Sequence, residues 1–308
     1  MNLLTYKILA NYEQVPVPII KKSNFSYAFF LLPNEKRIAI SNIYVICSYL
    51  DEIVDCQNYL NNSMDINSLN INNSADIKIV KKQRLDWWKT QIKFLYEKKI
   101  DCLQPLTQTI EKYQIPFNYF EILIDGIGRD IEQNSYNTFT ELLTYCYGVA
   151  SIVGLISLCI FLQEENKKLV ISDNLVIPDN IKNYAINLGY ALQLTNIMRD
   201  VGIDAARNYF YLPSEDLEKF GYSRQDILEC KYNANFVALM EFQYNRAMQY
   251  YEKAKELLKS DYNKNFRSAE MMHRIYFRLL QEIKRKNYNI YERKISISKF
   301  AKLKSFFF

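Results

Sequence analysis

Several residue types on which common enzyme sites depend are scarce in this chain of 308 residues. Glycine occurs seven times and histidine once, as His273, and no Cys-x-x-Cys pair is present. The two closest glycines, Gly126 and Gly128, form neither a P-loop nor a dinucleotide-binding fingerprint. A histidine-rich metal centre and a glycine-rich phosphate loop are therefore excluded, and any bound phosphate has to be held by metal ions and basic side chains.

Long apolar runs and a dense charge of one sign are also missing. No stretch of about 18 uninterrupted apolar residues occurs, and the closest, Val149 to Leu162, contains Ser151 and Ser157, so we predict no spanning helix. No secretory signal opens the chain. The net charge is only +5 and no helix carries a dense Lys/Arg stripe, which argues against nucleic-acid binding. Six cysteines without a disulfide framework are typical of a reducing compartment, so we expect a cytoplasmic protein.

The C-terminal end combines basic and aromatic side chains, namely Lys294, Lys299, Lys302, Lys304 and Phe306 to Phe308. A solvated end is the ordinary interpretation of such a charge run. The alternative is peripheral contact with an anionic membrane surface, which would suit a greasy substrate. The sequence carries no signal for an oligomeric state.

The apolar residues, which make up 49% of the chain, recur at helical spacing, and strand-type alternation is not convincing anywhere. We predict a single all-α domain over residues 1–308, with its helices around a central cavity. Ser214 and Ser223 are predicted to cap two short helices, and Asn61 to Asp76 is predicted to be a loop. The longer predicted helices are Ile38–Cys56, Ile77–Lys98, Pro116–Gln133, Phe139–Phe161, Asn180–Asp204, Ala234–Leu258 and Arg267–Asn287.

Two pairs of aspartates are the strongest chemical signal. Asp51 and Asp55 are four residues apart, as are Asp200 and Asp204. On a helix this spacing places both carboxylates on one face, where they repel each other unless a cation lies between them. Two such helices facing each other would form a cleft suited to Mg²⁺ and a diphosphate.

The second pair belongs to a longer polar stripe. Spacings of three, four and four residues place Gln193 and Asn196 on one face with the two aspartates, and Arg199 adds a phosphate-type donor. Two interpretations stay open at this point. The stripe is either the solvent-facing side of an amphipathic helix or half of a metal–diphosphate site.

The sequence around these pairs resembles the squalene/phytoene synthase family. Residues 192–204 with Tyr211-Leu212-Pro213 resemble the family's second signature, and residues 44–55 its first. The resemblance runs from about Lys21 to Lys304. Its further matches are Phe25 to Phe29, Leu31 to Pro33, Arg37, Asp125-Gly126, Asp130, Tyr145 to Ala150, Tyr276 and Arg293.

The resemblance implies a prenyl-synthase fold and head-to-head condensation of two prenyl diphosphates. It implies Mg²⁺, with Mn²⁺ as a substitute, on a set of oxygen ligands, and a catalytic role for Tyr145 beside the four aspartates. The implied metal ligands are Asp51, Asp55, Asn196, Asp200 and Asp204. The implied substrate-binding residues are Phe25, Tyr27, Arg37, Gln193, Asn196, Arg199, Arg207, Tyr276 and Arg293. For the aromatic members, ordinary core packing is the alternative.

The chain also departs from the family's pattern. Ser48, Ala206 and Tyr209 stand where the family usually has arginine, Ile203 where it often has glutamate, and Ser151 where glycine is common. Fewer arginines put diphosphate affinity in doubt, although Arg37, Arg199, Arg207 and Arg293 could compensate.

Three functions follow. The first is a C30 enzyme that joins two farnesyl diphosphates into presqualene diphosphate or squalene, with NADPH needed only for squalene. It is favoured by a likeness to the bacterial presqualene diphosphate synthase branch at Phe242-Gln243, Arg246-Ala247, Tyr250-Tyr251, Met271-Met272 and Ile275-Tyr276. The second is a phytoene synthase that uses two geranylgeranyl diphosphates. The third is an assembly or binding protein of the same fold with weakened catalysis.

Overall fold

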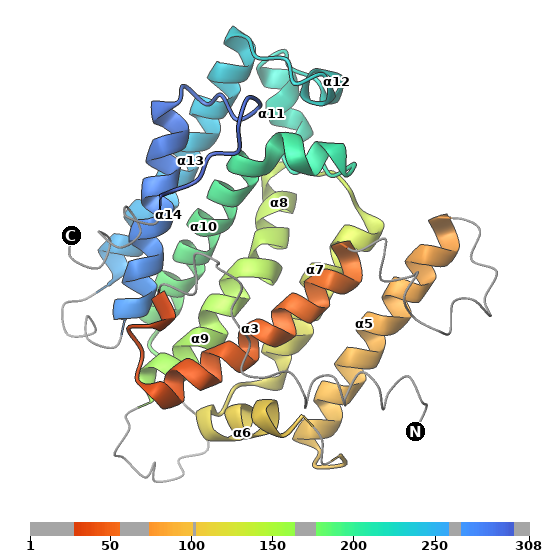
Figure 1. The fold of residues 1–308 in the computed structure, drawn as a ribbon, viewed down its shortest axis with the longest axis vertical. Helices are drawn as coiled ribbons and strands as arrows, with labels where there is room; N and C mark the ends of the chain where they lie inside the picture. The colour runs from red at the N-terminus through yellow and green to blue at the C-terminus, as the bar shows by residue number, and fades with distance from the viewer. Residues whose placement is uncertain (1–27, 56–73, 101–102, 164–176, 259–265, 299–308) are drawn as a thin grey trace. The chain divides into compact units, whose positions relative to one another are not determined.

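The computed structural model describes residues 28–55, 74–100, 103–163, 177–258 and 266–298. These residues form helices and connecting segments, with no strand beyond an isolated bridge between Ser135 and Phe210, as Figure 1 shows. The predicted all-α class is confirmed. The chain separates into a first unit of residues 1–23, 33–132 and 159–175 and a second unit of the remaining residues. The single domain stays a prediction, and each unit is described by itself.

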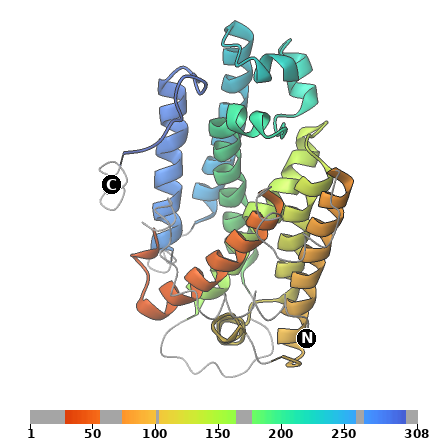
Figure 2. The same cartoon turned by 45° about the vertical axis from the view of Figure 1, so that its right-hand side comes forward.

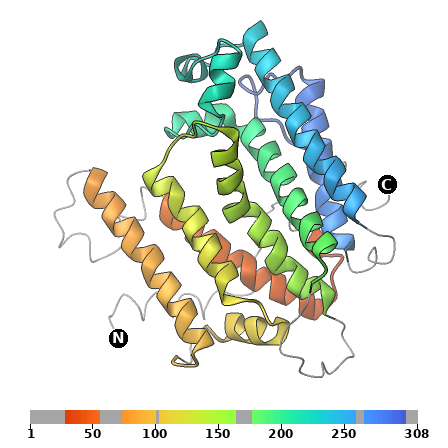
Figure 3. The ribbon, with the colours of Figure 1, turned by 180° about the vertical axis from the view of Figure 1, so that it is seen from behind.

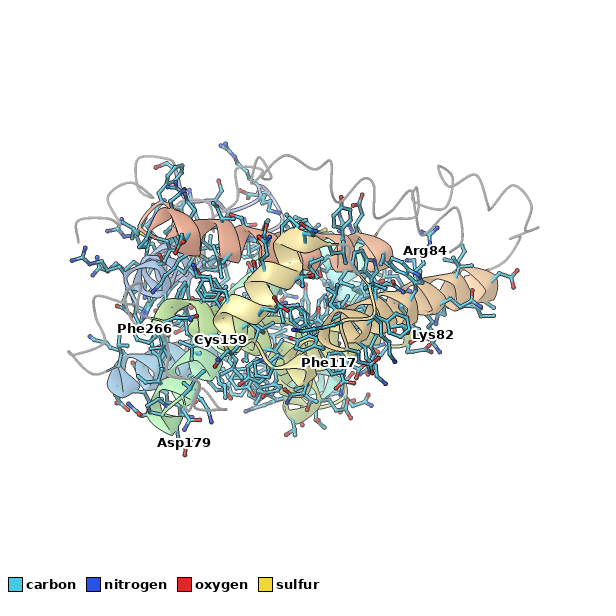
Figure 4. The ribbon with its side chains drawn as sticks, turned by 90° about the horizontal axis from the view of Figure 1, so that it is seen from below. Lys82, Arg84, Phe117, Cys159, Asp179 and Phe266 are labelled. Atoms are coloured by element: carbon cyan, nitrogen blue, oxygen red, sulfur yellow. The ribbon has the colours of Figure 1, made fainter. Side chains whose placement is uncertain are left out.

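The first unit is built from four described helices, in which α3 packs against α5, α6 and α7, and α5 packs against α7. Tyr96 ties two of them together, because its hydroxyl donates to the carbonyl of Ile115 and its ring meets that of Phe117, which is labelled in Figure 4, edge-on at 5.3 Å between centroids. The helices are α3 (Asn34–Asp55), α5 (Ser74–Tyr96), α6 (Gln104–Tyr113) and α7 (Phe117–Glu132).

The second unit is organised around α10 (Asp179–Ala206), which packs along α13 (Ala234–Leu257) and also contacts α14 (Arg267–Arg285). Figures 2 and 3 show these helices from two further directions. Tyr184 of α10 meets Phe266, labelled in Figure 4, edge-to-face at 5.6 Å. The remaining elements of this unit are α8 (Phe139–Cys146), a π-helical turn η1 (Tyr147–Ser151), α11 (Ser214–Lys219), α12 (Arg224–Leu228) and most of α9 (Ile152–Leu162), whose residues from Cys159 on belong to the first unit.

The predicted helix from Phe139 is continuous to Leu162 but contains the π-helical turn. This turn packs on α10 at Gly189, where an added Cβ would lie only 2.5 Å from the Cα of Ser151. Ser151 is fully buried and donates its hydroxyl to the carbonyl of Ile186 at 2.9 Å. A small residue on α10 therefore lets the serine fit where the family's pattern favours glycine.

The same segment, Phe139–Leu162, is long and apolar enough to cross a membrane, with a mean hydropathy of 2.1 over its best window. The prediction of no spanning helix stays a prediction. The serines do not interrupt this helix, because Ser157 donates its hydroxyl to the carbonyl of Val153. However, 61% of that window is buried inside the protein, as expected of a core helix.

The predicted cap at Ser223 is confirmed, because Ser223 and Asp226 form a reciprocal capping box at the start of α12. The cap at Ser214 is wrong. Pro213 occupies the N-cap of α11, and Ser214 is its first helical residue, with its hydroxyl directed to the carbonyl of Tyr136. The pattern also did not reveal α6, which begins after Leu103 in the left-handed region, at φ 55°.

Candidate active site

The polar stripe of α10 lies on the partly exposed side of that helix. Gln193, Asn196 and both aspartates are partly exposed, whereas Leu194, Ile197, Met198 and Val201 are buried. Asp200 and Asp204 fall near the C-terminal end of α10, whose last turn holds no basic residue. Negative charge there opposes the helix dipole, so this placement does not serve helix stability.

Asp200 is held by two cations of the second unit. The Arg199 guanidinium donates to both of its carboxylate oxygens, with 2.9 Å from Nε to Oδ1, and the ammonium of Lys294 lies 3.3 Å from Oδ1. Burial alone would raise the pKa of Asp200, but the hydrogen bonds and charge of Arg199, with Lys294, outweigh it and lower the pKa below its usual value. Asp200 is therefore a persistent anion.

Asn196 supplies a test of whether this stripe suits a metal ion. Its Oδ1 is buried and has no hydrogen-bond partner within the described residues. An unpaired buried acceptor is costly, and a cation is one partner that removes the cost. In the part of the chain that the structure describes, no group of three or more His, Cys, Asp or Glu side chains is placed to hold a metal. An amide oxygen with two carboxylates, completed by substrate oxygens, nevertheless fits a hard cation such as Mg²⁺.

The other acidic pair belongs to the first unit. Asp51 and Asp55 lie in the last turn of α3, which also lacks a basic residue, and both are solvent-exposed. The side chain of Asp51 reaches solvent, but the protein around it displaces much of the water that would stabilise its charge. This desolvation, followed by the negative charges of Asp55 and Asp130, raises the pKa of Asp51 to about 7. Asp125 on α7 is instead paired with Lys89 at 3.0 Å. The carboxylates near Asp51 thus repel one another, and a cation would relieve that repulsion.

A cluster of tyrosines adjoins Asp204 in the second unit. Tyr145 on α8 is buried, and its hydroxyl donates to that of Tyr211 at 3.3 Å. The ring of Tyr211 is stacked with those of Tyr145, at 5.2 Å, Tyr136, at 5.9 Å, and Tyr209, at 6.1 Å. A small pocket is lined by Asp204, Tyr209 and Tyr211 together with apolar side chains. The aromatic group therefore connects Tyr145 to the carboxylate stripe.

The remaining predicted substrate-binding residues are dispersed. Tyr276 on α14 is buried near Arg199. Burial of Arg199 is the largest effect on its pKa and lowers it, but Asp200, with smaller contributions from Tyr276 and Asp204, raises the pKa above its usual value. Arg207 and Arg293 are exposed in the second unit. Arg37 lies in the first unit, where it donates to Asn34 at 2.8 Å. Phe25 and Tyr27 lie outside the described residues.

Sequence reasoning missed two neighbours of the site. Tyr209 was noted only as a lost arginine, yet it extends the tyrosine stack. Lys294 was considered only as part of a basic tail, yet it contacts Asp200. The sequence offered one hint, because Lys294 directly follows the predicted substrate-binding residue Arg293. That position does not tell which residue of α10 the lysine contacts.

Comparison with known proteins shows to which family the chain belongs. The family model described as squalene/phytoene synthase matches residues 21–301. The 15-cis-phytoene synthase of Synechococcus elongatus is 32% identical over 91% of this chain and 85% of its own length. The phytoene synthase of Arthrospira platensis is 33% identical over 89% of this chain and 83% of its own.

Solved structures share the fold. A dehydrosqualene synthase in complex with a ligand superposes with a TM-score of 0.73 at 24% identity, covering 98% of this chain and 94% of that one. A squalene synthase from Alicyclobacillus acidocaldarius gives 0.71 at 19% identity, with 94% and 97% covered. With the family match over most of its length, the chain belongs to the squalene/phytoene synthase family and is a prenyltransferase of the class that condenses two prenyl diphosphates head to head.

Proposed function

We propose that this enzyme joins two geranylgeranyl diphosphates to form phytoene. The choice of substrate is carried by one observation: relatives that are 32–33% identical over about nine tenths of the chain are phytoene synthases. The chemistry of the α10 stripe supports the reaction class, because it offers oxygen ligands on one face of the helix and the neighbouring Arg199, which contacts Asp200.

The proposed metal ligands are Asn196, Asp200 and Asp204 of α10, with Asp51 and Asp55 of α3. Mg²⁺, or Mn²⁺ in its place, supplies charge neutralisation for the leaving diphosphate. Arg199 and the exposed Arg207 supply further positive charge from the protein itself. That the two acidic pairs face each other stays a prediction.

The tyrosine cluster suits the second requirement of the reaction, a dry environment for a carbocation. Tyr136 and Tyr145 are buried, and the stacked rings present π faces that stabilise a cation. The hydroxyl of Tyr145 is tied to that of Tyr211, which fixes its direction. We therefore assign Tyr145 to positioning the reacting chain and excluding water.

The hypothesis of a C30 enzyme loses part of its support, because some of the residues that favoured it have a packing role. Gln243 and Arg246 both donate to Asp216, at 2.9 and 3.1 Å, and Asp216 is only 3% exposed. The Arg246 guanidinium also lies 3.8 Å from the ring centroid of Phe139. Side chains engaged in this buried cluster do not report the length of the substrate.

A protein with weakened catalysis is the other alternative. Both acidic pairs lie at helix C-termini without a basic residue in the last turn. A chain released from catalysis gains stability by losing such carboxylates. Their presence therefore favours an active enzyme.

Product analysis tests the proposal. The full chain is incubated with Mg²⁺ and either farnesyl or geranylgeranyl diphosphate, with and without NADPH, and the products are identified by mass spectrometry. We expect phytoene from geranylgeranyl diphosphate, independent of NADPH. Presqualene diphosphate or squalene as the main product would overturn the choice of substrate, and turnover of neither substrate would support the weakened alternative.

Location is a separate proposal. We expect a cytoplasmic protein that sediments partly with anionic vesicles and is released by salt, since its substrates and product are greasy. Failure to sediment at low salt would contradict it. The basic tail that motivates this proposal lies mostly outside the described residues, with Lys294 as its described member.

A further inference from the structure

The segment after α14, residues 286–298, is anchored along the C-terminal end of α10; we name it the C-terminal strap (Figure 1, dark blue). Tyr291 lies so close to Gly202 of α10 that an added Cβ there would be 3.1 Å from its ring. Its hydroxyl is hydrogen-bonded to that of Tyr222 at 3.2 Å, and its ring packs on Phe236 at 4.9 Å. Tyr288, which is buried, donates to Glu241. The strap is therefore fixed by Tyr291 beside the acidic end of α10 and by Tyr288 on α13.

This anchoring delivers Lys294 to Asp200. The ammonium lies 3.3 Å from Oδ1, the oxygen that also accepts from Arg199 Nε. The Lys294 side chain is 56% exposed, whereas that of Asp200 is 16% exposed. The carboxylate is thus largely enclosed by two cations, of which the lysine is the more exposed one. Any metal ion that binds Asp200 has to compete with it.

We propose that Lys294 is a diphosphate-binding residue that neutralises Asp200 in the metal-free enzyme and turns to the substrate's phosphates when a metal ion takes Asp200. The inference rests on the proposed function for the nature of its ligand. A lysine is suited to this exchange, because its ammonium is a point charge on a flexible stem that needs no fixed geometry. Ala206 and Tyr209, at the same end of the unit, bring no positive charge, so Lys294 adds to Arg199 and Arg207.

The proposal predicts effects of opposite sign on two ligands. Without substrate, removing Lys294 takes away one of the two cations that compete with a metal ion for Asp200, and metal binding becomes stronger. With metal saturating, the same change removes a phosphate donor and weakens diphosphate binding. A purely structural lysine would weaken both or change neither, so the pair of measurements separates the two roles.

The experiment uses the full chain with Lys294→Met and a matched control, Lys286→Met, an exposed lysine at the start of the strap. Calorimetry measures Mg²⁺ binding in the absence of substrate, and then inorganic pyrophosphate binding at saturating Mg²⁺. For Lys294→Met we expect Mg²⁺ to bind about threefold to fivefold more tightly, the range of a partly exposed ion pair. We expect pyrophosphate to bind about tenfold more weakly. Lys286→Met should match the wild type in both.

Unchanged affinity for either ligand, or a loss of both, would overturn the proposal. Lys294→Arg keeps the charge and should restore pyrophosphate binding, which guards against a variant that merely misfolds. Failure of this proposal can be told apart from failure of the proposed function. If the protein makes no phytoene but Lys294→Met binds Mg²⁺ more tightly and pyrophosphate more weakly, the role of Lys294 stands. If the protein makes phytoene but Lys294→Met shows neither change in affinity, the role of Lys294 is wrong.

Discussion

The two acidic helix ends carry the same motif in different electrostatic states. Asp51 on α3 and Asp200 on α10 each begin a pair with four-residue spacing, in helices whose last turns hold no basic residue. Asp200 is paired with Arg199 and Lys294, and its pKa is lowered in spite of burial. Asp51 makes no ion pair with a lysine or arginine among the described residues, and the surrounding protein with nearby carboxylates raises its pKa to about 7.

The difference shows two ways in which a pair of neighbouring carboxylates can be neutralised in the absence of a metal ion. The α10 pair is balanced by protein charges, which a metal ion bound there would have to displace. The α3 pair is balanced near neutral pH by a proton on Asp51, which a metal ion bound there would also have to displace. Metal binding should therefore release a proton at α3 and a lysine at α10.

The largest expected effect comes from removing either leading carboxylate. Asp51→Asn and Asp200→Asn should each lower turnover roughly a thousandfold, since charge neutralisation of the leaving group is worth several kcal/mol. Steady-state kinetics at saturating Mg²⁺ measures this. Asp179→Asn, at the far end of α10 (Figure 4), is the matched control and should stay near wild type. Near wild-type turnover of Asp51→Asn or Asp200→Asn would show that the corresponding helix end is not part of the active site.

Stability against pH should separate the two ends by sign. The pKa of Asp51 is raised in the folded state, so its stabilising contribution is present below about pH 4 and is lost as pH rises towards 7. The pKa of Asp200 is lowered, so its contribution is present above about pH 4 and is lost as pH falls below that. Urea unfolding in EDTA between pH 3 and 8 is the measurement.

In that series, Asp51→Asn should become more stable than the wild type as pH rises from about 4 to 7, and the difference should then level off. Asp200→Asn should be less stable than the wild type near neutral pH, because Arg199 loses its partner. Two variants with parallel pH profiles would show that the two ends are in the same electrostatic state, contrary to the comparison.

A smaller effect is expected from Gly202→Ala, which disturbs the strap at α10 only. The new Cβ would lie 3.1 Å from Tyr291, whose ring is held by Tyr222 and Phe236. We expect a loss of about 1 kcal/mol in unfolding free energy, the lower end for overpacking, because alanine favours the helix. Metal affinity without substrate should rise, as the pairing of Lys294 weakens.

Gly128→Ala on α7 is the control for that change. Its new Cβ would meet only the end of the flexible Leu85 side chain, at 3.3 Å, so stability should be unchanged or higher by up to about 1 kcal/mol. If Gly202→Ala behaves like Gly128→Ala in both stability and metal affinity, the strap does not control the charge balance at Asp200.

Sequence reasoning could predict the long helices because apolar residues at helical spacing bury one face, as Leu194 and Ile197 do beneath the α10 stripe. It could predict the stripe for the same reason. It could not predict the π-helical turn, which depends on the approach of Gly189 to Ser151, or α6, which is short and begins at a left-handed residue. It also could not place Lys294, because that contact depends on how the strap packs in three dimensions.

The smallest expected effect concerns Lys81, a lysine that reaches the end of α3. Lys81 on α5 donates to the carbonyl of Val54, so its charge complements the helix terminus. Lys81→Met should cost about 0.3–1 kcal/mol in unfolding free energy, whereas the exposed Lys78→Met should cost less. Metal affinity should change less than in Lys294→Met, because Lys81 is not among the groups that shift the pKa of Asp51. Tighter metal binding by Lys81→Met, as expected for Lys294→Met, would mean that a lysine also competes for the α3 carboxylates, and the two acidic ends would then differ in degree rather than in kind.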